Sequence, residues 1–201
     1  MLELKTNRDY WIPSTGEPEL VYDPGGGQQD IREVALEYVT SWRGCIDAGA
    51  WVGMWTRDLM DKFQNVYAFE PNPLSAECFR RNIPLDKNAV LFEVGLGHKV
   101  HQAYFPKNTS QKLQMEPGDI SVRTLDSFEL TNIDFFKIDV DGYENRLLKG
   151  SLETIANNSP VINIEMKKKR PSVRKKSTDL LLSLGYRRKV RTRSDEVWIK
   201  Y

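Results

Sequence analysis

Apolar and polar positions follow two different periods along this chain, and together they predict alternating strands and helices. Short apolar runs bounded by turn residues predict buried strands at about 44–48, 66–70, 90–95, 134–140 and 161–166. Between them, apolar residues recur at helical spacing and predict helices over about 31–39, 53–63, 74–82, 142–150 and 175–184. Alternation of this kind indicates an α/β fold, a mostly parallel sheet with helices on both faces.

The two ends of the chain depart from this alternation. Residues 186–190 and 197–201 each alternate between apolar and polar positions, which predicts an antiparallel C-terminal hairpin. Residues 1–29 are rich in Pro and Gly and predict an irregular N-terminal arm, with Asp30 as the N-cap of the first helix. A length of 201 residues suits one domain, so we expect a single domain over 30–201.

Composition is that of a soluble globular protein, with 40% hydrophobic and 28% charged residues. No apolar run approaches the roughly 18 residues that a membrane span needs, and the first residues lack the pattern of a secretory leader. The two cysteines, Cys45 and Cys78, are too few for a disulfide framework or a metal knuckle. We therefore expect reduced, buried thiols and a cytoplasmic protein.

A net charge of +1 conceals an asymmetry between the two parts of the chain. Residues 167–201 contain thirteen Lys and Arg against three Asp and Glu, whereas residues 1–166 contain sixteen basic and twenty-five acidic residues. A basic end can attract an anionic partner, although a solvated basic surface is the more common meaning of such a segment.

The segment 47–53 (DAGAWVG) carries the clearest chemical signal. It follows a short apolar strand, and its glycines permit a sharp turn into a helix and close approach of a ligand. Glu70 lies twenty-three residues after Asp47, about where a carboxylate contacts the ribose in nucleotide-binding βαβ units. The dinucleotide pattern G-x-G-x-x-G is absent. The spacing therefore predicts a nucleotide-type ligand but argues against a dinucleotide.

Three blocks together resemble the FkbM family of methyltransferases: residues 46–53 (IDAGAWVG), 69–72 (FEPN) and 136–150 (FKIDVDGYENRLLKG). The third block is the most specific, and the resemblance covers about residues 30–166. It implies a Rossmann-like class I methyltransferase fold with a seven-stranded sheet, S-adenosylmethionine as methyl donor, and O-methylation of a small molecule or sugar. Trp51 departs from the family pattern, because an Asn is usual there, and the basic C-terminal region matches no family pattern.

In such a fold, ligands bind at the carboxyl ends of the strands, so the residues that end strands should line one crevice. Glu70 would accept hydrogen bonds from the ribose hydroxyls, and the glycine turn would approach the methionine portion of the methyl donor. The expected cofactor-binding residues are Asp47, Gly49, Ala50, Gly53, Glu70, Asn72, Gly95, Leu96 and Asp139.

Asp139 and Glu165 are the expected catalytic residues, because a hydroxyl acceptor needs a base or a metal to become nucleophilic. Asp139, Asp141 and Glu165 could instead bind an ion such as Mg²⁺. We favour the interpretation without metal, in which Asp141 belongs to the strand–helix turn. His98 and His101, the two histidines of the chain, are alternative bases.

The acceptor is the least defined part of the prediction. Basic residues in 167–176 directly follow the fifth strand, so the expected substrate is a small molecule, and an anionic one is an option. Methylation of nucleic acid, RNA above all, is an alternative that the basic segment supports. A binding module that holds the methyl donor without turnover is another, supported by Trp51 alone. The oligomeric state stays open.

Overall fold

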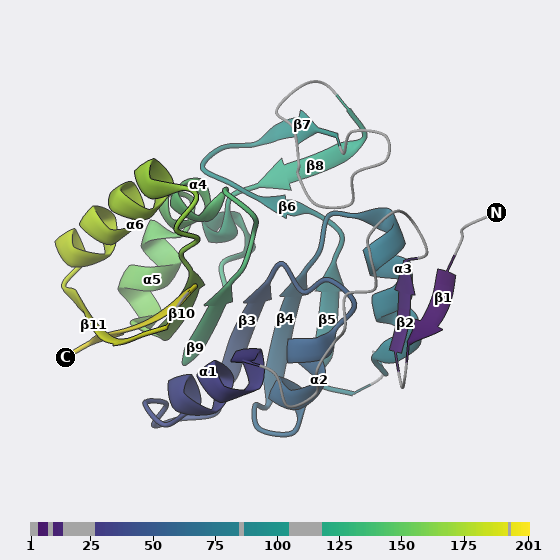
Figure 1. Ribbon diagram of the computed structural model, residues 1–201, viewed down its shortest axis with the longest axis horizontal. Helices are drawn as coiled ribbons and strands as arrows, with labels where there is room; N and C mark the ends of the chain where they lie inside the picture. Colours follow the sequence, from purple (N-terminus) through teal and green to yellow (C-terminus); the bar gives the residue numbers. More distant parts are fainter. Residues whose placement is uncertain (1–3, 8–9, 14–26, 85–86, 105–117, 193) are drawn as a thin grey trace.

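The computed structural model describes residues 4–7, 10–13, 27–84, 87–104, 118–192 and 194–201 (Figure 1). The central sheet consists of β3 (Gly44–Ala48), β4 (Asn65–Phe69), β5 (Ala89–Phe92), β9 (Phe135–Ile138), β10 (Val161–Glu165), β11 (Tyr186–Arg191) and β12 (Asp195–Lys200). Its seven strands are ordered β11-β12-β10-β9-β3-β4-β5.

Most of this sheet is parallel. Strands β10, β9, β3, β4 and β5 run in the same direction. Strand β12 runs antiparallel to β10 and forms a hairpin with β11 at the edge of the sheet. The predicted α/β fold and its antiparallel C-terminal pair are confirmed.

Helices cover both faces of the sheet, as the alternation of elements predicts (Figure 1). One face packs against α1 (Gly27–Leu36), α2 (Met54–Met60) and α3 (Pro73–Asn82). The other face packs against α4 (Glu144–Lys149), α5 (Leu152–Asn158) and α6 (Pro171–Ser183). Neighbouring residues of a strand point to opposite faces, so Cys45 packs with the first group and Ile46 with the second.

Two smaller sheets flank the central one. Strands β6 (Gly95–Leu96), β7 (His101–Ala103) and β8 (Ile120–Arg123) form a sheet that lies above the carboxyl ends of β3, β4 and β5 in Figure 1. Strands β1 (Leu4–Asn7) and β2 (Tyr10–Pro13) form an antiparallel hairpin beside α3. A short 3₁₀ helix, η1, spans Leu125–Phe128.

Several local expectations were wrong. The N-terminal arm is not irregular throughout, because it contains the β1–β2 hairpin, and α1 begins at Gly27, so Asp30 lies inside the helix rather than at its N-cap. The third predicted strand ends at Phe92, and Gly95 and Leu96 belong to the separate strand β6. Strands of two to four residues carry too few alternating positions to be recognised, which explains these differences. In the described part of the chain, no helix is both long and apolar enough to cross a membrane.

Candidate functional site

The turn between β3 and α2, residues 49–53, is held in an unusual backbone conformation and is called the glycine turn below. Gly49, Trp51 and Gly53 have φ angles of 78°, 49° and 91°. A Cβ atom on Gly49 would lie 1.8 Å from the carbonyl oxygen of Asp139, and one on Gly53 would lie 2.5 Å from Cγ1 of Ile83. Both glycines are therefore needed for the turn to pack against its neighbours.

Hydrogen bonds fix the glycine turn against the end of β4. The amides of Gly49 and Ala50 both donate to the carbonyl oxygen of Phe69, at 2.9 and 3.1 Å. The amide of Trp51 donates to Oε2 of Glu70 at 2.9 Å. The turn and Glu70 thus form one unit, as their spacing in the sequence predicts.

The carboxylate of Glu70 is buried and held from two sides. Its second oxygen, Oε1, accepts a hydrogen bond from the amide of Asn72 at 2.8 Å. Burial raises the pKa of Glu70 to about 7, although the bonds from the Asn72 and Trp51 amides act in the opposite direction. A carboxylate has about four acceptor sites, so two bonds leave capacity for the hydroxyls of a ligand.

The side chain of Asn72 caps the amino end of α3. Its Oδ1 accepts hydrogen bonds from the amides of Leu74 and Ser75, at 2.9 and 3.4 Å, which is an N-cap interaction. Its own amide orients Glu70. The predicted cofactor-binding role of Asn72 stays a prediction.

Asp47 acts on the glycine turn through a residue that the sequence analysis did not single out, Lys137. The two are register partners on β3 and β9, and Nζ of Lys137 lies 3.0 Å from Oδ1 of Asp47. Nζ also donates to the carbonyl oxygen of Gly49 at 2.6 Å, while Thr56 donates to Oδ2 of Asp47 at 2.7 Å. Asp47 is fully buried, so it shapes the turn from within the protein.

Lys137 stays charged in this environment. Burial disfavours its charged form, but the charges of Asp47 and Asp139 outweigh that effect and raise the pKa of Lys137. A lysine in the middle of the apolar strand 135–138 is the sequence signal that could have revealed a buried ion pair.

Asp139 and Glu165 lie side by side at the carboxyl ends of β9 and β10. The residues before them, Ile138 and Ile164, are register partners, and the two carboxyl groups share a hydrogen bond. Burial, with the charge of Asp139, raises the pKa of Glu165 to about 8. A hydrogen bond between two carboxyl groups needs a proton, so the pair holds one at neutral pH.

Two basic residues that follow β10, Lys167 and Arg170, are engaged with carboxylates. Nζ of Lys167 lies 2.8 Å from Oε2 of Glu165 and 2.6 Å from Oδ1 of Asp141. Nη1 of Arg170 lies 3.2 Å from Oδ1 of Asp141 and 3.9 Å from Oε1 of Glu144. Asp141 thus binds two cations of the protein, and among the residues that the structure describes no three His, Cys, Asp or Glu side chains are grouped to hold a metal ion.

Gly95, Leu96 and the two histidines belong to the small sheet and its connections. Gly95 pairs with Val122 of β8, and Leu96 is buried. Nδ1 of His101 lies 3.0 Å from the carbonyl oxygen of Lys99. Burial and the charge of Lys99 lower the pKa of His98. The expected contact of Gly95 and Leu96 with an adenine ring stays a prediction.

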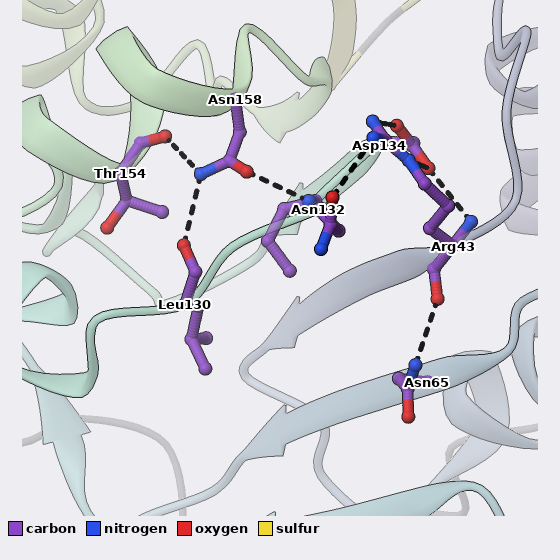
Figure 2. Close-up of polar contacts among 8 residues, drawn as sticks. Arg43, Asn65, Leu130, Asn132, Asp134, Thr154 and Asn158 are labelled. Carbon is purple, nitrogen blue, oxygen red and sulfur yellow. Dashed lines mark hydrogen bonds and ion pairs between the residues drawn. The ribbon is translucent and has the colours of Figure 1, made fainter.

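A second polar cluster lies at the opposite edge of the sheet (Figure 2). The amide and Nε of Arg43 donate to Oδ2 of Asp134 at 2.8 and 3.1 Å, and the Arg43 carbonyl accepts from Asn65 at 3.2 Å. Asn158 similarly ties Leu130 to Thr154. These side chains join the amino ends of strands to neighbouring loops, so the cluster is structural.

One known protein family matches most of the chain. The model of the "Methyltransferase FkbM domain" matches residues 47–188, a range that contains the glycine turn, Glu70, Asp139 and Glu165. No curated protein sequence matches the chain.

Solved structures share the fold at low sequence identity. The methyltransferase FkbM from Methylobacillus flagellatus KT is 22% identical with a TM-score of 0.63, covering 80% of this chain and 44% of its own. A candidate methyltransferase from Streptococcus mutans in complex with SAH is 15% identical with a TM-score of 0.54, covering 85% and 96%. An rRNA methylase from Streptococcus thermophilus is 12% identical with a TM-score of 0.52, covering 90% and 98%. The present chain thus spans less than half of the first of these proteins, and the likeness shows a class I methyltransferase fold.

Proposed function

Because the chain belongs to the FkbM family of S-adenosylmethionine-dependent methyltransferases, we propose that it methylates a hydroxyl oxygen of a small molecule such as a sugar. One observation carries the proposal: the glycine turn, Glu70 and the Asp139–Glu165 pair form one connected site. Trp51 of the turn bonds to Glu70, and Gly49 packs against the backbone of Asp139. The parts needed for a methyl donor and for an acceptor proton are therefore adjacent.

Glu70 and the glycine turn form the half of the site that binds S-adenosylmethionine. Bound there, S-adenosylmethionine supplies an electrophilic methyl group on its sulfonium sulfur. Glu70 accepts hydrogen bonds from the two ribose hydroxyls, a role that suits a carboxylate already oriented by two amides. Asp47 and Lys137 hold the Gly49 carbonyl in place. Gly53, Ala50, Asn72, Gly95 and Leu96 complete the proposed binding surface.

Asp139 and Glu165 form the acceptor half. Bound S-adenosylmethionine would supply the methyl group, and Asp139 would take the proton that the acceptor hydroxyl loses when the methyl group moves from sulfur to oxygen. The hydrogen bond between Glu165 and Asp139 orients the carboxyl group of Asp139 in this proposal. Positioning of the hydroxyl against the methyl group supplies most of the remaining rate enhancement.

The charges around the site favour a neutral acceptor over an anionic one. Asp141 lies beside both Lys167 and Arg170, which follow β10, and offsets part of their positive charge. Further along the chain, Arg174, Arg188 and Arg191 surround the buried carboxylate of Glu196. RNA is therefore the second candidate acceptor. It rests on the basic residues outside these ion pairs, such as the exposed Lys168 and Lys169.

Calorimetry with S-adenosylhomocysteine tests the methyl-donor half of the proposal. We expect micromolar binding by the intact chain, and a loss of roughly 1–3 kcal/mol in Glu70→Ala, the scale of lost charge-assisted hydrogen bonds. Glu153→Ala, on the exposed face of α5, is the matched control and should bind normally. Folded protein that does not bind S-adenosylhomocysteine would refute the proposal.

Transfer of labelled methyl groups tests the acceptor half. The protein and labelled S-adenosylmethionine are incubated separately with neutral sugars, with sugar phosphates and with total RNA. Label in the neutral fraction that disappears in Asp139→Asn is the expected result. Label in RNA alone would replace the acceptor class with RNA, and methyl-donor binding without turnover on any fraction would indicate a binding module.

A further inference from the structure

The N-terminal hairpin, strands β1 and β2, lies beside α3 (Figure 1) and shares an apolar cluster with the glycine turn. Tyr10 and Ile12 of β2 are buried in a cluster with Val52, Met54 and Cys78. Val52 is the fully buried residue between the two positive-φ residues Trp51 and Gly53. A segment that is distant in the sequence thus packs against the glycine turn at its buried residue Val52.

Asn82, near the end of α3, links the hairpin to the turn with every polar atom of its side chain. Its Nδ2 donates to the carbonyl oxygen of Val52 at 2.8 Å and to that of Trp11 at 2.9 Å. Its Oδ1 accepts from the amide of Trp11 at 2.7 Å. One amide group therefore satisfies both the backbone of β2 and the carbonyl of the turn.

Cationic side chains reinforce the same junction. The guanidinium of Arg57 lies 3.9 Å from the centre of the Tyr10 ring, and that of Arg81 lies 4.9 Å from the Trp11 ring. Arg57 is in α2, directly after the turn, and Arg81 is in α3. The hairpin is therefore attached to both helices that flank the turn, through aromatic, polar and apolar contacts.

We propose that the N-terminal hairpin holds the glycine turn in the conformation that binds the methyl donor, with Asn82 as the positioning residue. The ligand in this proposal is that of the proposed function, whereas the effect of the hairpin on the turn does not depend on the ligand. Three residues of the turn have positive φ, a conformation that the chain leaves readily unless neighbours hold it. The carbonyls of Gly49 and Val52 are held by Lys137 and Asn82 respectively. The first anchor comes from the sheet and the second depends on the hairpin.

The test compares Asn82→Ala with Asn88→Ala. Asn88 is a matched control, because its Nδ2 also donates to two carbonyl oxygens, those of Met60 and Phe63, at 2.9 and 2.7 Å. In the protein without ligand, hydrogen exchange at the amides of Trp51 and Gly53 should become at least tenfold faster in Asn82→Ala and unchanged in Asn88→Ala. The dissociation constant of S-adenosylhomocysteine should rise at least fivefold in Asn82→Ala alone.

A second variant reaches the turn from the hairpin side. Tyr10→Ala/Ile12→Ala removes the buried anchors of β2 while Asn82 is kept, and it should increase exchange at the same two amides. When it is combined with Asn82→Ala, the increase in exchange rate should be smaller than the product of the two separate increases, because both changes act through one junction. Unchanged exchange in both variants would overturn the proposal even if the protein binds S-adenosylhomocysteine. Absence of binding in the unmodified protein would instead refute the proposed function and leave the exchange result decisive.

Discussion

At the scale of single residues, Trp51 shows why one position departs from the resemblance to the family. Its φ of 49° lies in the left-handed region, where Asn and Gly are tolerated and bulky residues are strained. An Asn, the usual residue at this position in the family, suits that conformation. In this chain the tryptophan packs against the apolar cluster under the hairpin, and this contact offsets the strain.

The backbone conformation of Trp51 predicts that glycine is more favourable than alanine at this position, the reverse of their order within a helix. Trp51→Gly should be more stable than Trp51→Ala by about 0.5–1 kcal/mol, because alanine is disfavoured at positive φ. Lys175, an exposed residue within α6, provides the control. At that position the Ala variant should be more stable than the Gly variant by about 1 kcal/mol. Urea unfolding of the four variants measures both differences in the free energy of unfolding. A Trp51→Ala variant more stable than Trp51→Gly would contradict the left-handed conformation.

The raised pKa of Glu70 predicts that affinity for the methyl donor depends on pH. Burial places this pKa at about 7, and only the ionised form has acceptor sites for both ribose hydroxyls. The affinity for S-adenosylhomocysteine should therefore increase roughly tenfold from pH 6 to pH 8. Calorimetry at four pH values measures it. Glu70→Gln should bind more weakly with a flat profile, and an equally steep profile in that variant would assign the dependence to another group.

At the scale of elements, the sequence could predict the glycine turn but not what holds it. The order of glycines in 49–53 indicates a strand–helix turn from local information alone. The ion pair of Asp47 and Lys137 depends instead on β3 and β9 being neighbours in register, although they are ninety residues apart. The role of Asn82 likewise needs a hairpin whose strands are too short to be recognised.

The packing of the glycine turn against β9 predicts different costs for two glycine substitutions at similar φ. Gly49 and Gly185 have φ of 78° and 84°, so conformational strain of about 1 kcal/mol is common to both alanine variants. The two positions differ in the space around an added Cβ atom. At Gly49 this atom would lie 1.8 Å from the carbonyl oxygen of Asp139, a backbone atom. At Gly185 its nearest neighbour would be Cε of the Lys200 side chain, at 3.5 Å.

We therefore expect Gly49→Ala to be less stable than Gly185→Ala by at least about 2 kcal/mol. Chemical denaturation provides the comparison. Binding of S-adenosylhomocysteine should also be lost in Gly49→Ala and kept in Gly185→Ala. Equal stability of the two variants would mean that β9 does not constrain the turn.

At the scale of the whole molecule, the sequence predicts the architecture well and the charge distribution poorly. Periodicity places the parallel strands and the C-terminal hairpin, because each is encoded in a local run of residues. The count of basic residues in 167–201 indicates an anionic partner only if those charges are free. Several of them surround Glu196, whose burial could not be read from its place in an alternating segment.

The buried carboxyl groups predict how stability of the whole molecule changes with pH. The pKa of Glu165 is raised by burial to about 8, above the usual value of about 4.3 in an unfolded chain. Between these values the folded protein keeps a proton that the unfolded chain has lost, so the contribution of Glu165 to stability falls as pH rises. The slope from one such group cannot exceed about 1.4 kcal/mol per pH unit. Asp139 and Lys167 are the neighbours that modulate this pKa.

Glu165→Gln keeps a neutral hydrogen-bonding group at every pH and should therefore gain stability relative to the unmodified protein between pH 5.5 and pH 9. Urea unfolding at pH 5.5, 7 and 9 measures the difference, with Glu153→Gln on the exposed face of α5 as the control whose difference stays constant. If the stability of Glu165→Gln and that of the unmodified protein changed equally with pH, Glu165 would hold no proton at neutral pH. In that case Asp139 would lack the hydrogen bond that fixes the acceptor half of the site, and another group would have to orient it.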